Sequence, residues 1–296
     1  MTQSIAAYSP SSTAQPMADV VPEETRSASA RRESLIVNGL LALLGILFLA
    51  PLLWIFFASV DVNASWALSW PHFTLAHFRE VTRGDFLVSL VNTLLLSLVA
   101  SAVSTIAAIL GGYALSRRRV PLADGLMVTI LFLTGIPLAI MIVPVFQVYA
   151  QFNLLNLWAT GVFLGVCSLP FALWLIKTGM DAVPKELEEA ARMEQASILQ
   201  IILYVTVPVA LPSIFAALIY SFINAWGAFL PPLVLISDQN QITGPIKIYG
   251  LIGNSDVRYG DIAAFSLIYS LPVVILYILM SRPFSGGFSM GGAVKG

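Results

Sequence analysis

Six long apolar stretches divide the chain, and polar or charged residues gather between them. The stretches cover residues 35–60, 87–116, 122–148, 158–180, 209–237 and 262–281. A helix that crosses the hydrocarbon core of a bilayer needs about 20 apolar residues, and each stretch has that length. Each is also longer than a strand of a transmembrane barrel. The pattern therefore predicts an all-α membrane protein with six transmembrane helices.

Prolines interrupt the third and fourth stretches, among others. Pro137 and Pro144 lie in the third, and Pro170 lies in the fourth. A proline inside a span kinks the helix and frees carbonyl groups, which a cavity or a neighbouring helix must satisfy. We therefore expect bends in the third and fourth spans.

Composition supports the membrane class. Hydrophobic residues make up 58% of the chain and charged residues 10%, whereas a soluble domain carries roughly a quarter charged residues. The net charge of −1 gives no basic surface for nucleic acid. Cys167 is the only cysteine in the sequence, and His72 and His77 are its only histidines. No internal disulfide and no metal site is therefore expected.

The polar segments at the two ends predict tails. Residues 1–34 are rich in Ser, Ala, Pro and Glu, and such a composition cannot bury enough apolar surface to fold. We expect a disordered tail over 1–34, a transmembrane domain over 35–281 and a second tail over 282–296. The first apolar stretch is too long for the core of a signal peptide, so it is expected to be a retained span.

The distribution of Lys and Arg predicts the orientation in the membrane. With the N-terminus inside, 11 of the 15 basic residues are cytoplasmic, and Arg79, Arg83, Lys247 and Arg258 are outside. The cytoplasmic set is Arg26, Arg31, Arg32, Arg117, Arg118, Arg119, Lys177, Lys185, Arg192, Arg282 and Lys295. Cytoplasmic loops carry an excess of Lys and Arg, so both termini are predicted to be cytoplasmic.

The loop between the fourth and fifth stretches, about residues 181–208, contains a charged block at 184–197. Charged residues are costly in a bilayer, so this block must face water or another protein. Glu188 and Arg192 are four residues apart, in the order that favours an ion pair on a helix. After Gln195 an apolar pattern starts again, which predicts two short helices at the inner membrane face. An amphipathic surface helix without a partner is the alternative.

The motif in this block resembles the cytoplasmic coupling loop of ABC-importer permeases. That pattern is Glu-Ala-Ala, three residues, Gly, nine residues and Ile-x-Leu-Pro. Here Glu189-Ala190-Ala191 is followed after three residues by Gln195 and, nine residues further, by a segment that ends at Pro208. In the family the loop docks on the ATP-hydrolysing subunit and transmits its closure to the membrane helices. The resemblance assigns this coupling role to Glu189, Ala190, Ala191, Arg192, Gln195 and Ser197.

Gln195 departs from the pattern. Glycine adopts a positive φ readily at a helix–helix turn, and glutamine does so reluctantly. Three alternatives follow: the turn is built differently, the two helices run together, or the coupling is weakened.

Further motifs narrow the resemblance to the six-span partner subunit of carbohydrate importers of the maltose type. They are Asn92-Thr93-Leu94, the run 112–117, the run 184–187 and the C-terminal run 292–296. The resemblance implies the bundle of a type I ABC importer permease with a cytoplasmic coupling helix, in the bacterial inner membrane. It implies a second homologous permease, two ATPase subunits that bind ATP and Mg²⁺, an extracytoplasmic binding protein and a sugar or oligosaccharide substrate. It also implies that Val294 and Lys295 contact the ATPase subunits.

Polar and aromatic residues in the apolar stretches are candidates for the substrate path. Tyr220 and Asn224 are four residues apart and share a helix face. Asn92 and Trp226 complete the candidate set, and Gly227 stands where the group usually has asparagine. An amide at membrane depth is costly unless it is paired or lines a cavity. The alternative role of all four is hydrogen bonding and packing between helices.

Features that the sequence lacks exclude other functions. The span interiors carry essentially no Asp, Glu, Lys or Arg, which argues against a self-contained secondary carrier or channel, the alternative function. There is no glycine-rich phosphate loop that ends in Gly-Lys-Ser or Gly-Lys-Thr. No Ser/His/Asp or paired-carboxylate arrangement predicts a catalytic site. The chain is therefore predicted not to be an enzyme and to bind no cofactor itself.

Overall fold

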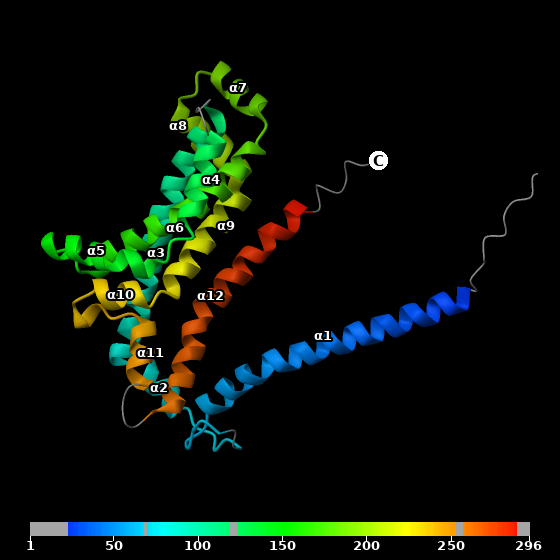
Figure 1. The fold of residues 1–296 in the computed structure, drawn as a ribbon, viewed down its shortest axis with the longest axis vertical. Helices are drawn as coiled ribbons and strands as arrows, with labels where there is room; N and C mark the ends of the chain where they lie inside the picture. Colours follow the sequence, from blue (N-terminus) through cyan, green and yellow to red (C-terminus); the bar gives the residue numbers. More distant parts are fainter. Residues whose placement is uncertain (1–22, 68–69, 119–122, 253–256, 289–296) are drawn as a thin grey trace, which may run out of the picture. The chain divides into compact units, whose positions relative to one another are not determined.

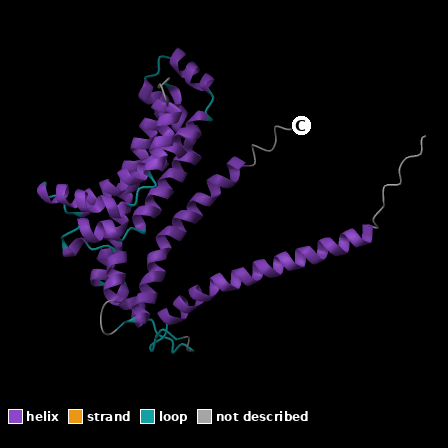
Figure 2. Ribbon diagram, in the orientation of Figure 1, coloured by secondary structure: helices purple, strands orange, loops and turns teal. Residues whose placement is uncertain are grey.

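The computed structural model describes residues 23–67, 70–118, 123–252 and 257–288. Figure 2 shows that helices and loops make up this part of the chain, with one isolated antiparallel bridge between Asp61 and Phe73. The chain has two compact units, Met1–Leu53 and Trp54–Gly296. The first contains most of α1 (Glu23–Ser59), and the second contains every other helix. The all-helical prediction is confirmed.

Three long helices form the centre of the second unit: α3 (Gly84–Arg117), α6 (Leu157–Asp181) and α9 (Val207–Trp226). They run side by side (Figure 1). Small residues let the backbones approach, as is usual between helices in membranes. A Cβ atom added to Gly165 on α6 would lie 2.7 Å from the carbonyl oxygen of Ala100 on α3. The hydroxyls of Ser104 and Ser221 lie 3.0 Å apart and join α3 to α9.

Five helices are long and apolar enough to cross a membrane, and a bent pair brings the number to six among the described residues. The bent pair is α4 (Ala123–Leu133) and α5 (Leu138–Gln151), which meet at 83°. The third span therefore bends, as its prolines predicted, but the bend separates two helices instead of kinking one. Pro137 is extended, with φ −61° and ψ 126°, and a proline disfavours helix at the residue before it. Pro144 and Pro170 remain inside α5 and α6.

The fifth span begins and ends earlier than predicted. It runs over Ile198–Trp226, through α8 (Ile198–Ile201), the π-helical turn η1 (Ile202–Thr206) and α9. The prediction of two short helices was therefore wrong for the second one, which is the first turn of the span. Pro208 lacks the N–H of a regular helix and clashes with the carbonyl four residues before it, and the wider π turn precedes it. The separate helix α10 (Leu230–Leu235) follows Gly227.

The other end of the bundle carries α2 (Ala76–Val81), the 3-10 turn η2 (Gln239–Gln241), α11 (Gly244–Ile252) and the start of α12 (Tyr259–Phe288). His77 Nδ1 lies 2.7 Å from Asp261 Oδ1 and joins α2 to α12. Arg258 Nη1 lies 3.0 Å from the second oxygen of Asp261. The buried carboxylate of Asp261 therefore has partners on both sides.

The helices at the two chain ends extend beyond the predicted spans. α1 begins at Glu23, so residues 23–34, expected in the disordered tail, are helical. This segment is rich in Ala, Arg and Glu, which favour helix. α12 continues to Phe288, into the predicted C-terminal tail. Val294 and Lys295 lie outside the described residues.

Candidate functional site

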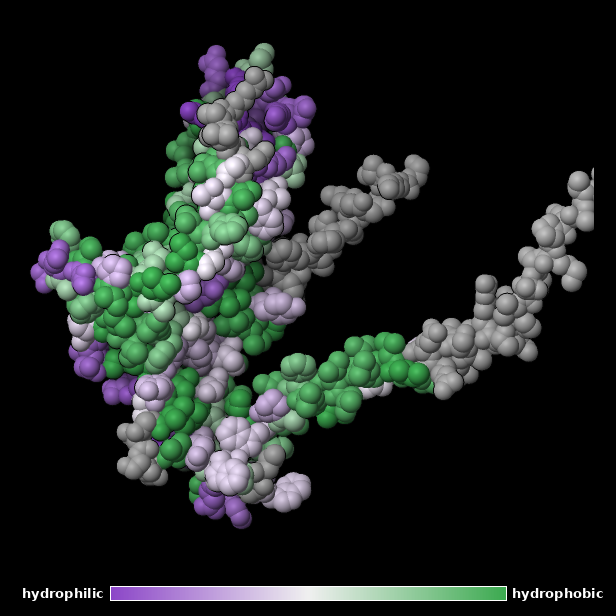
Figure 3. Space-filling view, in the orientation of Figure 1, coloured by the Kyte–Doolittle hydropathy of each residue, from purple (hydrophilic) through white to green (hydrophobic). Residues whose placement is uncertain are grey.

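The predicted coupling helix is present as α7 (Lys185–Met193) at one end of the second unit (Figure 1). Hydrophilic side chains gather over this end (Figure 3). Glu186 and Glu188 lie in the first turn and Arg192 in the last, the arrangement that the helix dipole favours. In the predicted motif, Glu189 and Ala190 are exposed and Ala191 is half-buried. The motif therefore exposes a charged residue and a small residue side by side.

Gln195 holds the turn after α7 in the left-handed conformation, with φ +61°. The Ala196 N–H donates to the Ala191 carbonyl at 3.1 Å, and the Gln195 N–H donates to the Arg192 carbonyl at 3.0 Å. These two bonds define a Schellman motif, which glycine usually completes. Glutamine therefore builds the turn that a glycine would build, and α7 and α8 remain separate helices.

Ser197 begins the helix that follows the turn. Its backbone N–H donates to Gln200 Oε1 at 2.8 Å, and its hydroxyl oxygen accepts from the Gln200 N–H at 3.4 Å. This reciprocal pair is a capping box. Ser197 thus sets the point at which the chain turns into the fifth span.

Glu188 has a role that the sequence did not predict. It is only 2% exposed, and Arg117 Nε of α3 donates to its Oε1 at 2.7 Å. The Thr206 hydroxyl of η1 donates to the same oxygen at 3.0 Å, and the Tyr113 hydroxyl donates to Oε2 at 3.3 Å. The expected partner Arg192 is 4.0 Å away. The main partner of Glu188 is therefore on another helix.

The sequence indicated one part of this network, the pair on α3. Tyr113 and Arg117 are four residues apart at the end of the second apolar stretch, so they share a face of α3. Arg117 is separated from Glu188 by 71 residues. Periodicity predicts which residues share a face, but it does not pair residues on distant helices.

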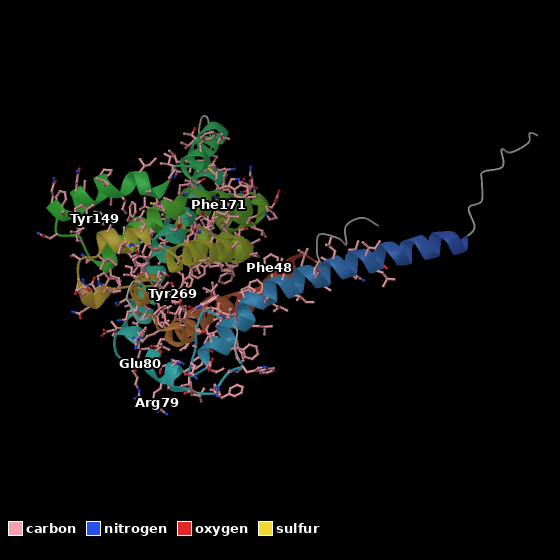
Figure 4. The ribbon with its side chains drawn as sticks, turned by 60° about the horizontal axis from the view of Figure 1, so that its bottom comes forward. Phe48, Arg79, Glu80, Tyr149, Phe171 and Tyr269 are labelled. Atoms are coloured by element: carbon pink, nitrogen blue, oxygen red, sulfur yellow. The ribbon has the colours of Figure 1, made fainter. Side chains whose placement is uncertain are left out.

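Two of the predicted path residues hold the bundle together at its other end. The Asn92 amide donates to the carbonyls of Asn240 and Ile242 at 2.8 and 3.0 Å. Trp226 Nε1 donates to the Tyr269 carbonyl at 3.2 Å, and the Tyr269 hydroxyl donates to the Trp226 carbonyl. Figure 4 shows Tyr269 on α12. Asn92 and Trp226 are both buried.

The other two predicted path residues lie together on α9. The Tyr220 ring is 4.4 Å from the Phe171 ring of α6, which Figure 4 labels. Asn224 is exposed, and its amide donates to the Tyr220 carbonyl at 2.8 Å. Sequence reasoning missed Phe171. The structure therefore combines an exposed amide and an aromatic pair from two central helices.

Comparison with known proteins places this architecture in a family. Residues 103–282 match the family model of the binding-protein-dependent transport system inner membrane component. An inner membrane ABC transporter permease protein of Escherichia coli is 32% identical over 75% of this chain and 81% of its own length. A trehalose transport system permease protein of Mycobacterium tuberculosis is 29% identical, over 84% of this chain and 93% of that protein.

A solved structure shares the fold. It is the crystal structure of a bacterial ABC transporter involved in the import of the acidic polysaccharide alginate. The match has a TM-score of 0.72 at 22% identity and covers 86% of this chain and 97% of that chain. The predicted resemblance to ABC-importer permeases is confirmed, and the apolar helices make the chain a multi-pass membrane protein. The chain belongs to the binding-protein-dependent transport system inner membrane components, and it is a permease subunit of an ABC transporter.

Proposed function

We propose that this permease forms half of the translocation pathway of an importer for a sugar or oligosaccharide. The observation that carries the proposal is the end of the bundle formed by α7, the Gln195 turn and α8. It presents Glu189 and Ala190 to the surface, and α7 is anchored to α3 and η1 beneath it. The names of similar proteins support a carbohydrate, since they include trehalose and lactose transport system permease proteins.

The partners follow from the proposed role. A second homologous permease completes the pathway, and an extracytoplasmic binding protein delivers the substrate. The two permeases rest on two ATPase subunits, one of which binds at α7 of this chain. ATP and Mg²⁺ belong to the ATPase subunits, so this chain supplies no residue to their chemistry. Val294 and Lys295 are proposed as a further contact with the ATPase subunits.

The proposed orientation places α7 and both termini in the cytoplasm. Arg117, Lys177, Lys185 and Arg192 all belong to the α7 end of the bundle, at the ends of α3 and α6 or on α7 itself. The opposite end carries Arg79, Arg83, Lys247 and Arg258. Arg118 also follows α3 at the α7 end, so that end carries more of these basic residues than the opposite end, which supports a cytoplasmic α7.

We place the substrate path along α9, at Tyr220 and Asn224. An aromatic ring and an amide side by side suit a sugar, which offers apolar C–H faces and hydroxyl edges. An amide exposed from the fold at membrane depth is costly unless it lines a wet cavity or meets a partner. Asn92 and Trp226 would bound the path at its outer end through the contacts that hold η2 and α12.

The proposed mechanism is alternating access. ATP closes the ATPase dimer, the coupling helices move with it, and the cavity between the two permeases changes the side to which it opens. The chain moves no proton and forms no covalent bond in this cycle. Its residues transmit the movement of the ATPase subunits to the membrane helices and line the path of the substrate.

Co-purification with the ATPase subunits tests the coupling surface. Ala190→Trp places a large side chain on the exposed surface of α7, so the variant should insert normally but retain much less ATPase subunit. Gln239→Trp is the control, because Gln239 is exposed in η2, at the other end of α3. Equal recovery of ATPase subunit with wild-type, Ala190→Trp and Gln239→Trp chains would show that α7 is not the docking surface.

A further inference from the structure

The coupling helix is held to the membrane domain mainly by a charge. Within α7, all of whose residues the structure describes, Glu188 alone is buried. The apolar side chains of Leu187 and Met193 are 46% and 86% exposed. Burial of apolar surface, which docks most helices, therefore contributes little here.

The carboxylate of Glu188 joins three elements. Arg117 and Tyr113 come from the end of α3, Thr206 comes from the end of η1, and Glu188 itself belongs to α7. Arg117 also donates from Nη2 to the Val183 carbonyl at 2.9 Å, in the segment between α6 and α7. The side chains of Arg117 and Glu188 are 6% and 3% exposed. The buried Arg117–Glu188 pair therefore contacts the chain on both sides of α7, at Val183 and at Thr206.

The partners of Glu188 and Arg117 lie on a packed apolar cluster. Tyr113 and Val183 belong to an apolar cluster with Ile176, Met180 and Ile214, from α3, α6 and α9. A Cβ added to Gly112 of α3 would lie 3.2 Å from the Lys177 backbone nitrogen of α6. The inner ends of α3 and α6 are therefore in close backbone contact, and a pull on Arg117 is applied to both helices.

The contact through Thr206 reaches the fifth span at its irregular turn. Thr206 is the last residue of the π-helical turn, and α9 begins at the next residue. π turns inside helices often occur at functional sites. Thr206 therefore links α7 to the start of α9, the helix that carries Tyr220 and Asn224.

We propose that Glu188 is a positioning residue that makes α7, the inner end of α3 and the start of α9 move together when the ATPase subunits close. Leaving a buried charge without its partner is strongly unfavourable. Separating Arg117 from Glu188 therefore costs more free energy than moving the three elements together. The proposal rests on the proposed function, because it deepens the role of the coupling helix.

The test compares Glu188→Gln with Glu186→Gln in the full complex, reconstituted with its ATPase subunits and binding protein. Both substitutions remove one carboxylate from the first turn of α7, but Glu186 is exposed. In Glu188→Gln we expect the stimulation by substrate, measured as the ratio of the stimulated to the basal rate of ATP hydrolysis, to fall by about tenfold. This is the size of effect expected for the loss of one charge-assisted hydrogen bond. ATP hydrolysed per substrate transported should rise. Glu186→Gln should behave as wild type.

A role in folding alone predicts a different result, namely less assembled complex with an unchanged ratio of ATP to substrate. Unchanged stimulation and an unchanged ratio in Glu188→Gln would overturn the proposal. If Glu188→Gln fails to assemble, Thr206→Val and Tyr113→Phe serve as the test. Each removes one hydrogen-bond donor to Glu188 and leaves the ion pair with Arg117 intact. Both should assemble with partly reduced stimulation, and full stimulation in both would also overturn the proposal.

Hydrogen exchange on the isolated chain separates this proposal from the proposed function. If the wild-type chain binds no ATPase subunit, the proposed function fails, but the anchor is still measurable. Amides of α7 should exchange about tenfold faster in Glu188→Gln than in Glu186→Gln, because exchange reports local opening. Equal exchange in the two variants would show that Glu188 does not hold α7.

Discussion

The Ala196 N–H donates to the Ala191 carbonyl at 3.1 Å, across a glutamine whose φ is +61°. The bond closes the helix that presents the coupling motif. Left-handed backbone costs an L-residue other than glycine roughly 1–2 kcal/mol. The turn of this permease therefore keeps its geometry at a cost in stability, which the rest of the loop offsets.

Gln195→Gly should stabilise the chain by about 1 kcal/mol, because glycine adopts this φ without the steric cost. Thermal unfolding of the purified chain in detergent measures the change. Glu194→Gly is the matched control, since Glu194 has φ −85°, where glycine only adds freedom to the unfolded chain. The control should lose stability by about 0.5–1 kcal/mol. Two variants of equal stability would contradict the assigned turn.

Gly244→Ala should destabilise the outer end of the bundle. An added Cβ would lie 2.5 Å from the Tyr269 ring and 3.4 Å from the Thr93 hydroxyl, so the cost should be about 1–3 kcal/mol. Gly250→Ala, in the same helix α11, meets nothing within 4 Å. It should be neutral or stabilising by about 0.5–1 kcal/mol. Unfolding midpoints compare the two, and equal effects would mean that α11 and α12 do not pack as described.

The two asparagines in the predicted path should respond differently to alanine. Asn92→Ala leaves two carbonyls without their donor, so stability should fall by about 1–3 kcal/mol. Asn224→Ala should leave the unfolding midpoint nearly unchanged and reduce substrate uptake by about tenfold, as expected for one lost hydrogen bond to the substrate. Uptake against substrate concentration and thermal unfolding separate the two effects. Full uptake by Asn224→Ala would remove that residue from the path.

Much of the fold could be predicted from the lengths of the apolar stretches alone. Bilayer thickness requires long runs, and the spans of α1, α3, α6 and α12 lie where the sequence predicted them. The fifth span overlaps its predicted range only over residues 209–226. Bends were expected at the prolines, but the sequence did not show that the helix would end before Pro137, because Pro144 and Pro170 have the same sequence signature and remain inside helices. Local sequence shows where a helix is weakened. Packing decides whether it breaks.

For the proposed coupling site, the sequence predicted the motif but not the contacts of Glu188 that hold α7 in place. The spacing from Glu189 to Pro208 located the loop, and the identity of Gln195 identified the turn as unusual. Glu188 was interpreted as a surface partner of Arg192, because a helical pattern contains only local pairs. Arg192 lies 4.0 Å away, and the shorter contact, with Arg117 at 2.7 Å, comes from another helix. A pair so far apart in the sequence cannot be found without the fold.

ATP hydrolysis by the reconstituted complex tests the central claim most directly. The chain would be assembled in proteoliposomes with its second permease, its ATPase subunits and its binding protein, and sugars would be screened one by one. If the chain is a permease of a sugar importer, at least one sugar, loaded on the binding protein, stimulates ATP hydrolysis, and its uptake stops when ATP is removed. Uptake by this chain alone without ATP, together with no stimulation by any sugar, would contradict the account.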